Sequence, residues 1–228
     1  MKIGIFSDIH GNIYAFEKIW AALKKESCEL YLFLGDICGY YYHQNEIIEM
    51  LKGINNLIAI RGNHDDLFLR ILRDNKTEAE YTRHYGKSAT ILKGKINQDS
   101  LKFLRKLPKK IVLPNKKIGI FHGSPWRYLD EYIYPTANLG RFGKLPYSYI
   151  FLGHTHYPMY KTVKGIKIIN PGSCGQPRDS GKPSYATVDL DSGKVSLKRV
   201  SYNNSALIKD ILRHSEKNKY LIEVLMRN

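Results

Sequence analysis

The 228-residue sequence predicts an α/β fold with a largely parallel β-sheet, and three short apolar segments carry this prediction. Residues 2–7, 30–34 and 57–60 each run into a turn that contains glycine together with aspartate, asparagine or histidine, as buried strands often do. The first two segments are followed by apolar residues at helical spacing, at 13–23 and 45–52. Repeated strand-then-helix units favour parallel pairing, which gathers the loops at the strand carboxyl ends on one edge of the sheet.

The segment after the third strand is expected to be helical. From Asp65 to about Leu107 the residues are mostly polar and charged, and helix starts are expected at Asp65, Thr77 and Asn97. The dipeptide Leu107-Pro108 ends this pattern, because a residue before proline avoids the helical conformation. A helical segment at this place in the chain could cover the loop edge of the sheet.

The second half of the chain predicts a further, partly antiparallel sheet. The expected strands are 118–121, 150–152, 166–169, 185–190 and 195–200, of which the first two run into clusters of glycine and histidine. The last two are joined through Asp191-Ser192-Gly193, which is a typical hairpin turn. Residues 205–226 have helical spacing with a polar gap at 215–219, which fits a docked helix, a broken pair of helices or a partner surface.

Composition excludes several classes of protein. Hydrophobic residues make up 43% and charged residues 25%, so the chain can bury a core and is neither disordered nor fibrous. The longest apolar runs fall far short of the ~18 residues that a membrane span needs, and we expect no secretory leader before Asp8. Three cysteines without C-x-x-C spacing indicate neither a disulfide framework nor a thiolate metal site. We therefore expect a cytoplasmic protein with reduced thiols and no membrane partner.

The chain is strongly basic. Lysine and arginine number 36 against 21 aspartates and glutamates, a formal net charge of +15. Long-range attraction of this sign favours phosphate-bearing partners, including nucleotides and nucleic acid. The alternative is a solvated surface on which lysine is simply the commonest polar residue.

Five of the eight histidines lie in glycine-bearing loops that follow predicted strands. They are His10, His64, His122, His154 and His156. Imidazole nitrogens together with carboxylate and amide oxygens are the ligands of borderline first-row divalent metals. The sequence therefore predicts a site for manganese, iron, nickel or zinc.

The candidate ligands are too many for one ion that keeps open positions. They are Asp8, His10, Asp36, Asn63, His122, His154 and His156. Two ions ~3.5–4 Å apart, sharing one carboxylate, clamp the attacking and leaving oxygens of an in-line displacement at phosphorus and make hydroxide available near neutral pH. The sequence has neither a Gly-x-Ser-x-Gly elbow nor a Walker A pattern, so the nucleophile need not be a side chain.

Five motifs occur along the chain in a fixed order. They are Asp8-Ile9-His10, Gly35-Asp36, Gly62-Asn63-His64-Asp65, His122 and Gly153-His154-Thr155-His156. In this order they resemble the signature of the calcineurin-like metallophosphoesterase superfamily, and residues 170–179 resemble its small prokaryotic phosphodiesterase-like branch. The resemblance implies an α/β fold of two packed mixed β-sheets flanked by helices, in four α/β/β/α layers. For this chain it implies a single domain over 1–228, with a helical insertion or cap at 65–115 and a C-terminal helical tail at 205–228.

The resemblance also implies how the ligands divide between two ions. One ion would take Asp8, His10, Asp36 and His156, and the other would take Asp36, Asn63, His122 and His154. Asp36 would then be the bridging carboxylate.

Further residues acquire roles from the same resemblance. His64 would sit over the phosphate and protonate the leaving oxygen, with Asp65 orienting the ring. Asn12 and Arg178 would bind phosphate oxygens. The alternatives are a helix cap for Asn12 and a surface pair with Asp179 for Arg178.

These implications favour a divalent-metal-dependent phosphodiesterase that works by in-line attack of a metal-bridging hydroxide. Two alternatives stay open: a phosphomonoesterase acting on nucleotides or phosphoproteins, and a non-catalytic interaction module on the same fold. The rim of the site departs from the branch pattern at residues 41–44. The aromatic residues Trp126, Tyr128, Tyr132 and Tyr134 either stack on a base or pack within their loop.

Overall fold

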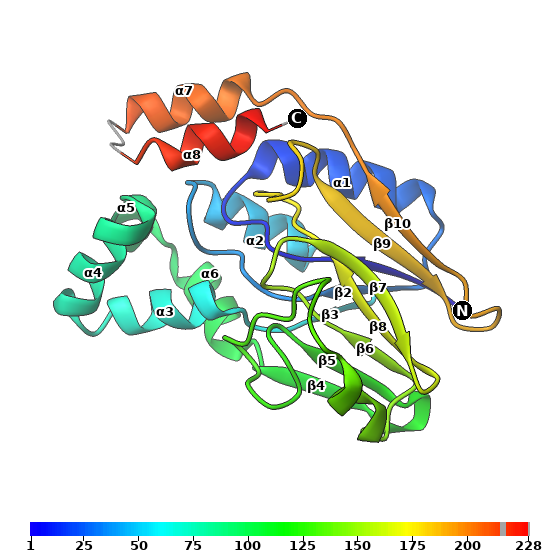
Figure 1. The fold of residues 1–228 in the computed structure, drawn as a ribbon. Coiled ribbons are helices and arrows are strands. Elements are labelled where there is room, and N and C mark those ends of the chain that lie inside the picture. Colours follow the sequence, from blue (N-terminus) through cyan, green and yellow to red (C-terminus); the bar gives the residue numbers. More distant parts are fainter. Residues whose placement is uncertain (215–217, 228) are drawn as a thin grey trace.

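Two five-stranded sheets form the centre of the protein in a computed structural model, which describes residues 1–214 and 218–227 (Figure 1). The first sheet has the order β10-β9-β1-β2-β3 and the second has the order β4-β5-β6-β8-β7. The strands of the first sheet are β1 (Lys2–Phe6), β2 (Leu30–Phe33), β3 (Leu57–Ala59), β9 (Ser184–Asp189) and β10 (Val195–Arg199). Those of the second are β4 (Lys110–Leu113), β5 (Ile118–Phe121), β6 (Tyr149–Phe151), β7 (Pro158–Val163) and β8 (Ile166–Pro171).

Both sheets are mixed. In the first, β1, β2 and β3 pair in parallel, with Ile3 opposite Leu30, and β9 joins β1 in the antiparallel direction. In the second, β5, β6 and β8 are parallel, while β4 and β7 are antiparallel edge strands. The parallel strands of both sheets place their carboxyl ends at one edge, as the sequence predicted.

The sheets pack face to face through one buried apolar cluster. Side chains of β1 and β2, such as Ile5 and Leu32, contact Ile120 and Phe151 of the second sheet. Helices α1 (Ile13–Lys25) and α2 (Gln44–Lys52) cover the outer face of the first sheet through a second cluster. The outer face of the second sheet packs against residues 128–147, which include the short helix η2 (Gly140–Lys144). The expected architecture of two packed mixed sheets flanked by helices is thus confirmed.

Local sequence explains the first helix. Asn12 caps α1 by accepting a hydrogen bond from the Ala15 backbone N–H, 3.1 Å away. Phe16, Ile19 and Leu23 follow at spacings of three and four residues and are all fully buried. The apolar face of α1 therefore lies on the sheet while its polar face stays in solvent.

Four helices lie between β3 and β4. They are α3 (Asn63–Ile71), α4 (Asn75–Tyr85), α5 (Ser88–Lys95) and α6 (Gln98–Lys106). Asp74 caps α4, and its carboxylate accepts from the Lys76 N–H at 3.0 Å, so this helix starts earlier than Thr77. Within the range 65–115, residues 110–113 form β4 and residues Pro114–Lys116 form the short helix η1. The sequence signal for β4 was weak because an edge strand is only half buried.

The C-terminal segment is a docked pair of helices. It comprises α7 (Ser205–Arg213), α8 (Tyr220–Glu223) and the short helix η3 (Val224–Met226), whereas residues 215–217 and 228 of the expected tail lie outside the described residues. Leu207 and Leu221 pack against Tyr41, and the Asp210 carboxylate accepts hydrogen bonds from Tyr14 and His43. Over the described ranges, no helix is long and apolar enough to cross a membrane.

Candidate metal centre

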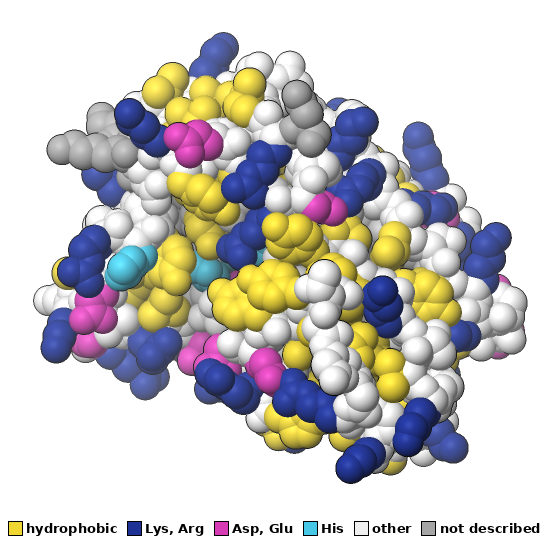
Figure 2. All heavy atoms as spheres, in the orientation of Figure 1, with side chains coloured by type: hydrophobic (Ala, Val, Ile, Leu, Met, Phe, Trp, Pro, Cys, Tyr) yellow, Lys and Arg dark blue, Asp and Glu magenta, His cyan; other side chains and the backbone are white. Residues whose placement is uncertain are grey.

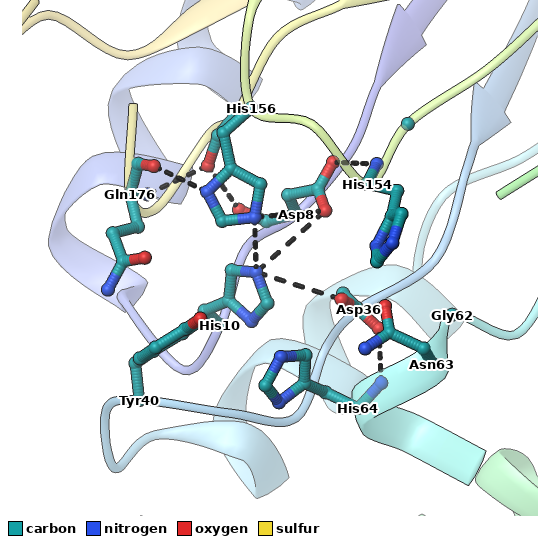
Figure 3. Close-up of polar contacts among 12 residues, drawn as sticks. Asp8, His10, Asp36, Tyr40, Gly62, Asn63, His64, His154, His156 and Gln176 are labelled. Atoms are coloured by element: carbon teal, nitrogen blue, oxygen red, sulfur yellow. Dashed lines mark hydrogen bonds and ion pairs between the residues drawn. The ribbon is translucent and has the colours of Figure 1, made fainter. Parts of the chain in front are cut away.

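All seven predicted ligands meet at the edge where the parallel strands of both sheets end, and Figure 3 labels all of them except His122. Asp8 and His10 follow β1, Asp36 follows β2, Asn63 begins α3 just after β3, His122 follows β5, and His154 and His156 follow β6. Asn63 is half buried, and each of the other six is at most 5% exposed. The site therefore assembles from five loops that are far apart in the sequence.

The ligand atoms form two overlapping groups. Asp8, His10 and His156 offer atoms that lie within 4.8 Å of one another, and so do Asp8, Asp36 and His122. Asp8 Oδ1 is 3.4 Å from His156 Nε2 and 4.0 Å from His122 Nε2. Asp36 Oδ2 is 3.3 Å from His122 Nε2 and 3.7 Å from His10 Nε2. Both carboxylates thus face both groups.

The ring nitrogens show what these groups can bind. The Nδ1 atoms of His10 and His156 each lie within hydrogen-bond distance of a backbone carbonyl, at 2.8 Å from Cys38 and 2.6 Å from Gln176. The proton of each neutral ring is therefore on Nδ1, and the two Nε2 atoms, 3.0 Å apart, both present lone pairs. Facing lone pairs repel unless a cation lies between them. A backbone carbonyl behind each imidazole is also the arrangement typical of metal-binding histidines.

On the other side of the centre, His122 lies between two oxygen atoms. His122 Nδ1 is 2.7 Å from the Leu34 carbonyl, and its Nε2 is 2.9 Å from the Asn63 side-chain oxygen. Two further buried atoms, Asp8 Oδ1 and His154 Nε2, have no hydrogen-bond partner among the described residues. Divalent cations would satisfy all of these atoms, so the donor set fits the metal site that the sequence predicts.

The negative charge of the buried carboxylates also favours binding of a cation at the centre. Burial opposes ionisation of Asp8, but the neighbouring His156 and His122 hold the pKa of that carboxyl at about 2. Burial lowers the pKa of His122, yet Asp36 and Asp8 outweigh it and raise that pKa to about 9. Burial, together with the nearby His122, lowers the pKa of His154 to about 3. The histidines around them therefore keep both buried carboxylates ionised, and a divalent cation bound there would neutralise the same negative charge.

Five of the seven ligands have an uncommon backbone conformation. Asp8, His10, Asp36, His154 and His156 all have positive φ angles, between 51° and 69°. Side-chain-bearing residues rarely adopt this conformation, and when they do it often marks a functional site. The strand-end loops thus turn sharply enough to aim successive side chains at one point.

Comparison with known proteins identifies the family. The profile of the calcineurin-like phosphoesterase superfamily domain matches residues 1–193. The chain belongs to this superfamily. A protein of Methanocaldococcus jannaschii is 31% identical over 93% of this chain and 92% of its own length, and the Escherichia coli phosphodiesterase YfcE is 22% identical over 92% and 97%. The crystal structure of a metallophosphoesterase from Sphaerobacter thermophilus superposes with a TM-score of 0.85 at 26% identity and covers 100% of this chain and 98% of its own.

The chain is therefore a hydrolase of the metallophosphoesterase type, and its family is metal-dependent. A protein from Pyrococcus horikoshii, with a TM-score of 0.84 at 22% identity over 99% of this chain and 98% of its own, has the same fold. The assignment of individual ligands to individual ions stays a prediction.

The resemblance implied that Asp65 orients the His64 ring, but among the described residues the Asp65 carboxylate has other partners. Its carboxylate accepts hydrogen bonds from three backbone N–H groups, those of Asp36, Cys38 and Gly62, at 2.8–3.0 Å. Burial and the nearby Asp36 raise the pKa of Asp65 to about 6. Asp65 therefore holds together the two loops that carry Asp36 and Asn63.

A tyrosine takes the place expected for Asp65. The Tyr81 hydroxyl lies 3.4 Å from His64 Nδ1, and the rings of Tyr40 and Tyr85 lie 5.1 and 4.9 Å from the His64 ring. Burial lowers the pKa of His64 to about 4. Sequence reasoning missed these tyrosines, since Tyr81 and Tyr85 lie in the helical segment, where no motif marks them.

Asn12 is a helix cap in this structure, which favours the alternative to phosphate binding that the sequence left open. Its side-chain oxygen accepts from Ala15, and its amide donates to the Gly175 carbonyl at 2.8 Å and to the Tyr202 hydroxyl at 3.1 Å. The residue is fully buried, so no polar atom is left for a substrate.

Arg178 faces the centre instead of pairing with its neighbour. Asp179 pairs with Arg199, whereas the Arg178 guanidinium donates to the Tyr40 hydroxyl at 3.2 Å. Burial works against the charge, but Tyr40, Tyr220 and Tyr132 nearby raise the pKa of Arg178. Arg178 is therefore a fixed cation at the mouth of the site.

The aromatic residues that follow His122 were expected either to stack on a base or to pack within their loop. Tyr132 packs on the His154 ring, with centroids 3.9 Å apart, and on Tyr134 at 5.6 Å. Trp126 instead packs against Phe142 and beneath Arg141. Figure 2 shows a hollow with histidine side chains inside it and with hydrophobic and basic side chains around its rim.

Proposed function

We propose that this metallophosphoesterase hydrolyses phosphodiesters at a pair of divalent ions held by the seven ligands. The observation that carries the proposal is the convergence of imidazole nitrogens on two carboxylates, with His10 and His156 only 3.0 Å apart at Nε2. Relatives named phosphodiesterase, from Escherichia coli and Methanocaldococcus jannaschii, support the diester preference.

The geometry and the resemblance together support one division of the ligands between the two ions. His10 and His156 would hold one ion with Asp8, and Asn63, His122 and His154 would hold the other with Asp36. Because both carboxylates face both groups, either can bridge. Nitrogen and oxygen donors without thiolate suit manganese, iron, nickel or zinc, and we propose manganese for assay.

The bound ions would supply Lewis-acid polarisation of the phosphate and a water of lowered pKa. The protein's own residues supply the rest. The Tyr81 hydroxyl at Nδ1 leaves His64 Nε2 as the ring nitrogen that can give a proton to the leaving oxygen. Arg178, fixed by Tyr40, would neutralise charge on a non-reacting phosphate oxygen.

We further propose a single domain in which the helical part of the expected segment 65–115, from α3 to α6, forms a cap beside the site, whereas residues 110–113 belong to the second sheet. Tyr81 and Tyr85 of this segment contact His64, so the cap would shape the space for the leaving group. A cytoplasmic location is proposed because three cysteines without disulfide spacing suit a reducing compartment. A monoester substrate is the alternative, and the same ligands would serve it.

The test is hydrolysis of bis-p-nitrophenyl phosphate by metal-stripped protein to which single metals are returned. We expect no turnover after chelation and recovery with manganese, because two carboxylates cannot hold substrate and water in place without the ions. p-Nitrophenyl phosphate serves as the monoester control, and a higher kcat/KM for it would assign the alternative. Full activity in the presence of excess chelator would contradict the proposal.

A further inference from the structure

The excess positive charge of the chain is concentrated in one stretch. Residues 100–129 contain eight lysines and arginines and no aspartate or glutamate. The whole chain has a net charge of +15, so these thirty residues carry more than half of the excess. Such a block is expected to generate a local positive field even in a basic protein.

These cations lie along the outer edge of the second sheet. They sit on the end of α6, around β4, on the turn after it and on the loop after β5, and we call them the basic band: Lys102, Arg105, Lys106, Lys109, Lys110, Lys116, Lys117 and Arg127. Figure 1 shows α6 leading into β4 at this edge. Because β4 is an edge strand, one of its sides has no neighbouring strand.

Most of the band is not neutralised. Lys102, Lys109 and Arg127 pair with Asp99, Asp66 and Asp130, respectively. For Arg105, Lys106, Lys116 and Lys117 no ion pair occurs within residues 1–214 and 218–227, and all four are exposed. Lys110 lies over the Tyr128 ring, 4.3 Å from its centroid.

A cationic hollow adjoins the band. Four arginines, Arg61, Arg70, Arg73 and Arg105, line a cavity of about 340 Å³ between α3 and α6. The lining holds one carboxylate, that of Asp66, which is shared among Arg61, Arg70 and Lys109 at 3.2–3.9 Å. The hollow therefore keeps a surplus of positive charge that suits a phosphate group.

The band begins beside the metal centre. The Arg61 backbone N–H donates to the Pro108 carbonyl at 2.8 Å, two residues before the ligand Asn63. Lys110 pairs in register with Phe121, the residue before the ligand His122. From this point β4 carries the band away from the centre toward Lys116 and Lys117.

We propose that the basic band and the adjoining hollow bind the backbone of a single-stranded nucleic acid, which presents a phosphodiester to the metal centre. This inference rests on the proposed function, because a nucleic acid carries the scissile diester and further phosphates on one chain. Trp126 is 41% exposed although Arg141 lies over its ring, and it offers a surface on which a base can stack. The buried ligands favour an unpaired strand over a duplex.

The test compares two charge-reversal variants with matched positions. The first variant, Arg105→Glu with Lys106→Glu, changes the last turn of α6. The second, Lys24→Glu with Lys25→Glu, changes the last turn of α1. Both alter the net charge by the same amount and place two acidic side chains at the C-terminal end of a helix, where they are equally unfavourable. Binding of a fluorescein-labelled oligothymidylate is followed by fluorescence anisotropy with chelator present, so that no strand is cut. The band variant is expected to bind at least about tenfold more weakly than the α1 variant, and its log–log salt dependence to be shallower by about 1.4.

Either of two results would overturn the inference: equal weakening in both variants, or unchanged binding in the band variant. Thermal melting checks that each variant is folded, and Lys116→Glu with Lys117→Glu replaces the first pair if α6 does not tolerate it. Oligothymidylate binding is measured without metal, whereas hydrolysis of small diesters is measured separately with the unsubstituted protein. A negative result for nucleic-acid binding can therefore be told apart from a failure of the proposed function.

Discussion

Replacing His64 by alanine is expected to slow hydrolysis of a diester with an alkyl leaving group by about 10²- to 10⁴-fold, the usual contribution of a general acid. The loss should be far smaller with p-nitrophenyl esters, because p-nitrophenolate departs without a proton. His64 is 5% exposed beside the ligand cluster, and its Nδ1 lies by Tyr81, which leaves Nε2 as the ring nitrogen that can approach the leaving oxygen. The measurement is kcat for both esters in the metal-loaded protein.

His84→Ala is the matched control, since this histidine lies on α4 and is exposed. It should leave both rates unchanged. Tyr81→Phe provides a second variant, and it should lower kcat for the alkyl ester while changing KM little, because the hydroxyl orients the ring without touching substrate. Equal losses on both esters in His64→Ala would assign His64 a structural role and refute proton donation.

Asp36→Asn is expected to lower kcat/KM strongly. Loss of a residue that hydrogen-bonds to a metal ligand costs roughly 10- to 100-fold, and loss of the ligand itself should cost more. Asp36 Oδ2 lies between the two ligand groups, 3.3 Å from His122 Nε2 and 3.7 Å from His10 Nε2. Asparagine keeps the oxygen that accepts from the His64 backbone N–H at 2.8 Å, so the loops should hold their shape. The measurement is activity together with metal content after dialysis.

The control for this variant is Asp99→Asn, an exposed carboxylate on α6. It removes the same charge away from the centre and should change neither activity nor metal content. If Asp36→Asn retained both metal and turnover, Asp36 would not be a ligand, and Asp8, which also faces both groups, would be the remaining candidate for the bridge.

Much of the fold was predictable because it depends on local patterns. The buried strands β1, β2 and β5 are short apolar runs that end at glycine, and the cap and apolar spacing of α1 are readable from Asn12 to Leu23. The edge strands β4 and β7 escaped prediction because most of their residues are exposed or only half buried, so neither is a continuous apolar run. Pairing across the sheet, rather than local propensity, stabilises such strands.

The candidate site was also predictable only in part. The seven ligands are visible in the sequence because strand ends of a parallel sheet converge, and the structure brings all of them together. The partners of Asn12 and Asp65 were not visible. Asn12 meets Gly175 and Tyr202, and Asp65 meets Cys38, through hydrogen bonds that depend on how distant loops pack.

The most direct test is anomalous X-ray diffraction from crystals of the protein grown with manganese. We expect two peaks per chain, one beside His10 and His156 and the other beside His122 and His154, with the carboxylates of Asp8 and Asp36 between them. A single peak would contradict the dinuclear centre. The absence of any peak among these side chains would contradict the metal site itself.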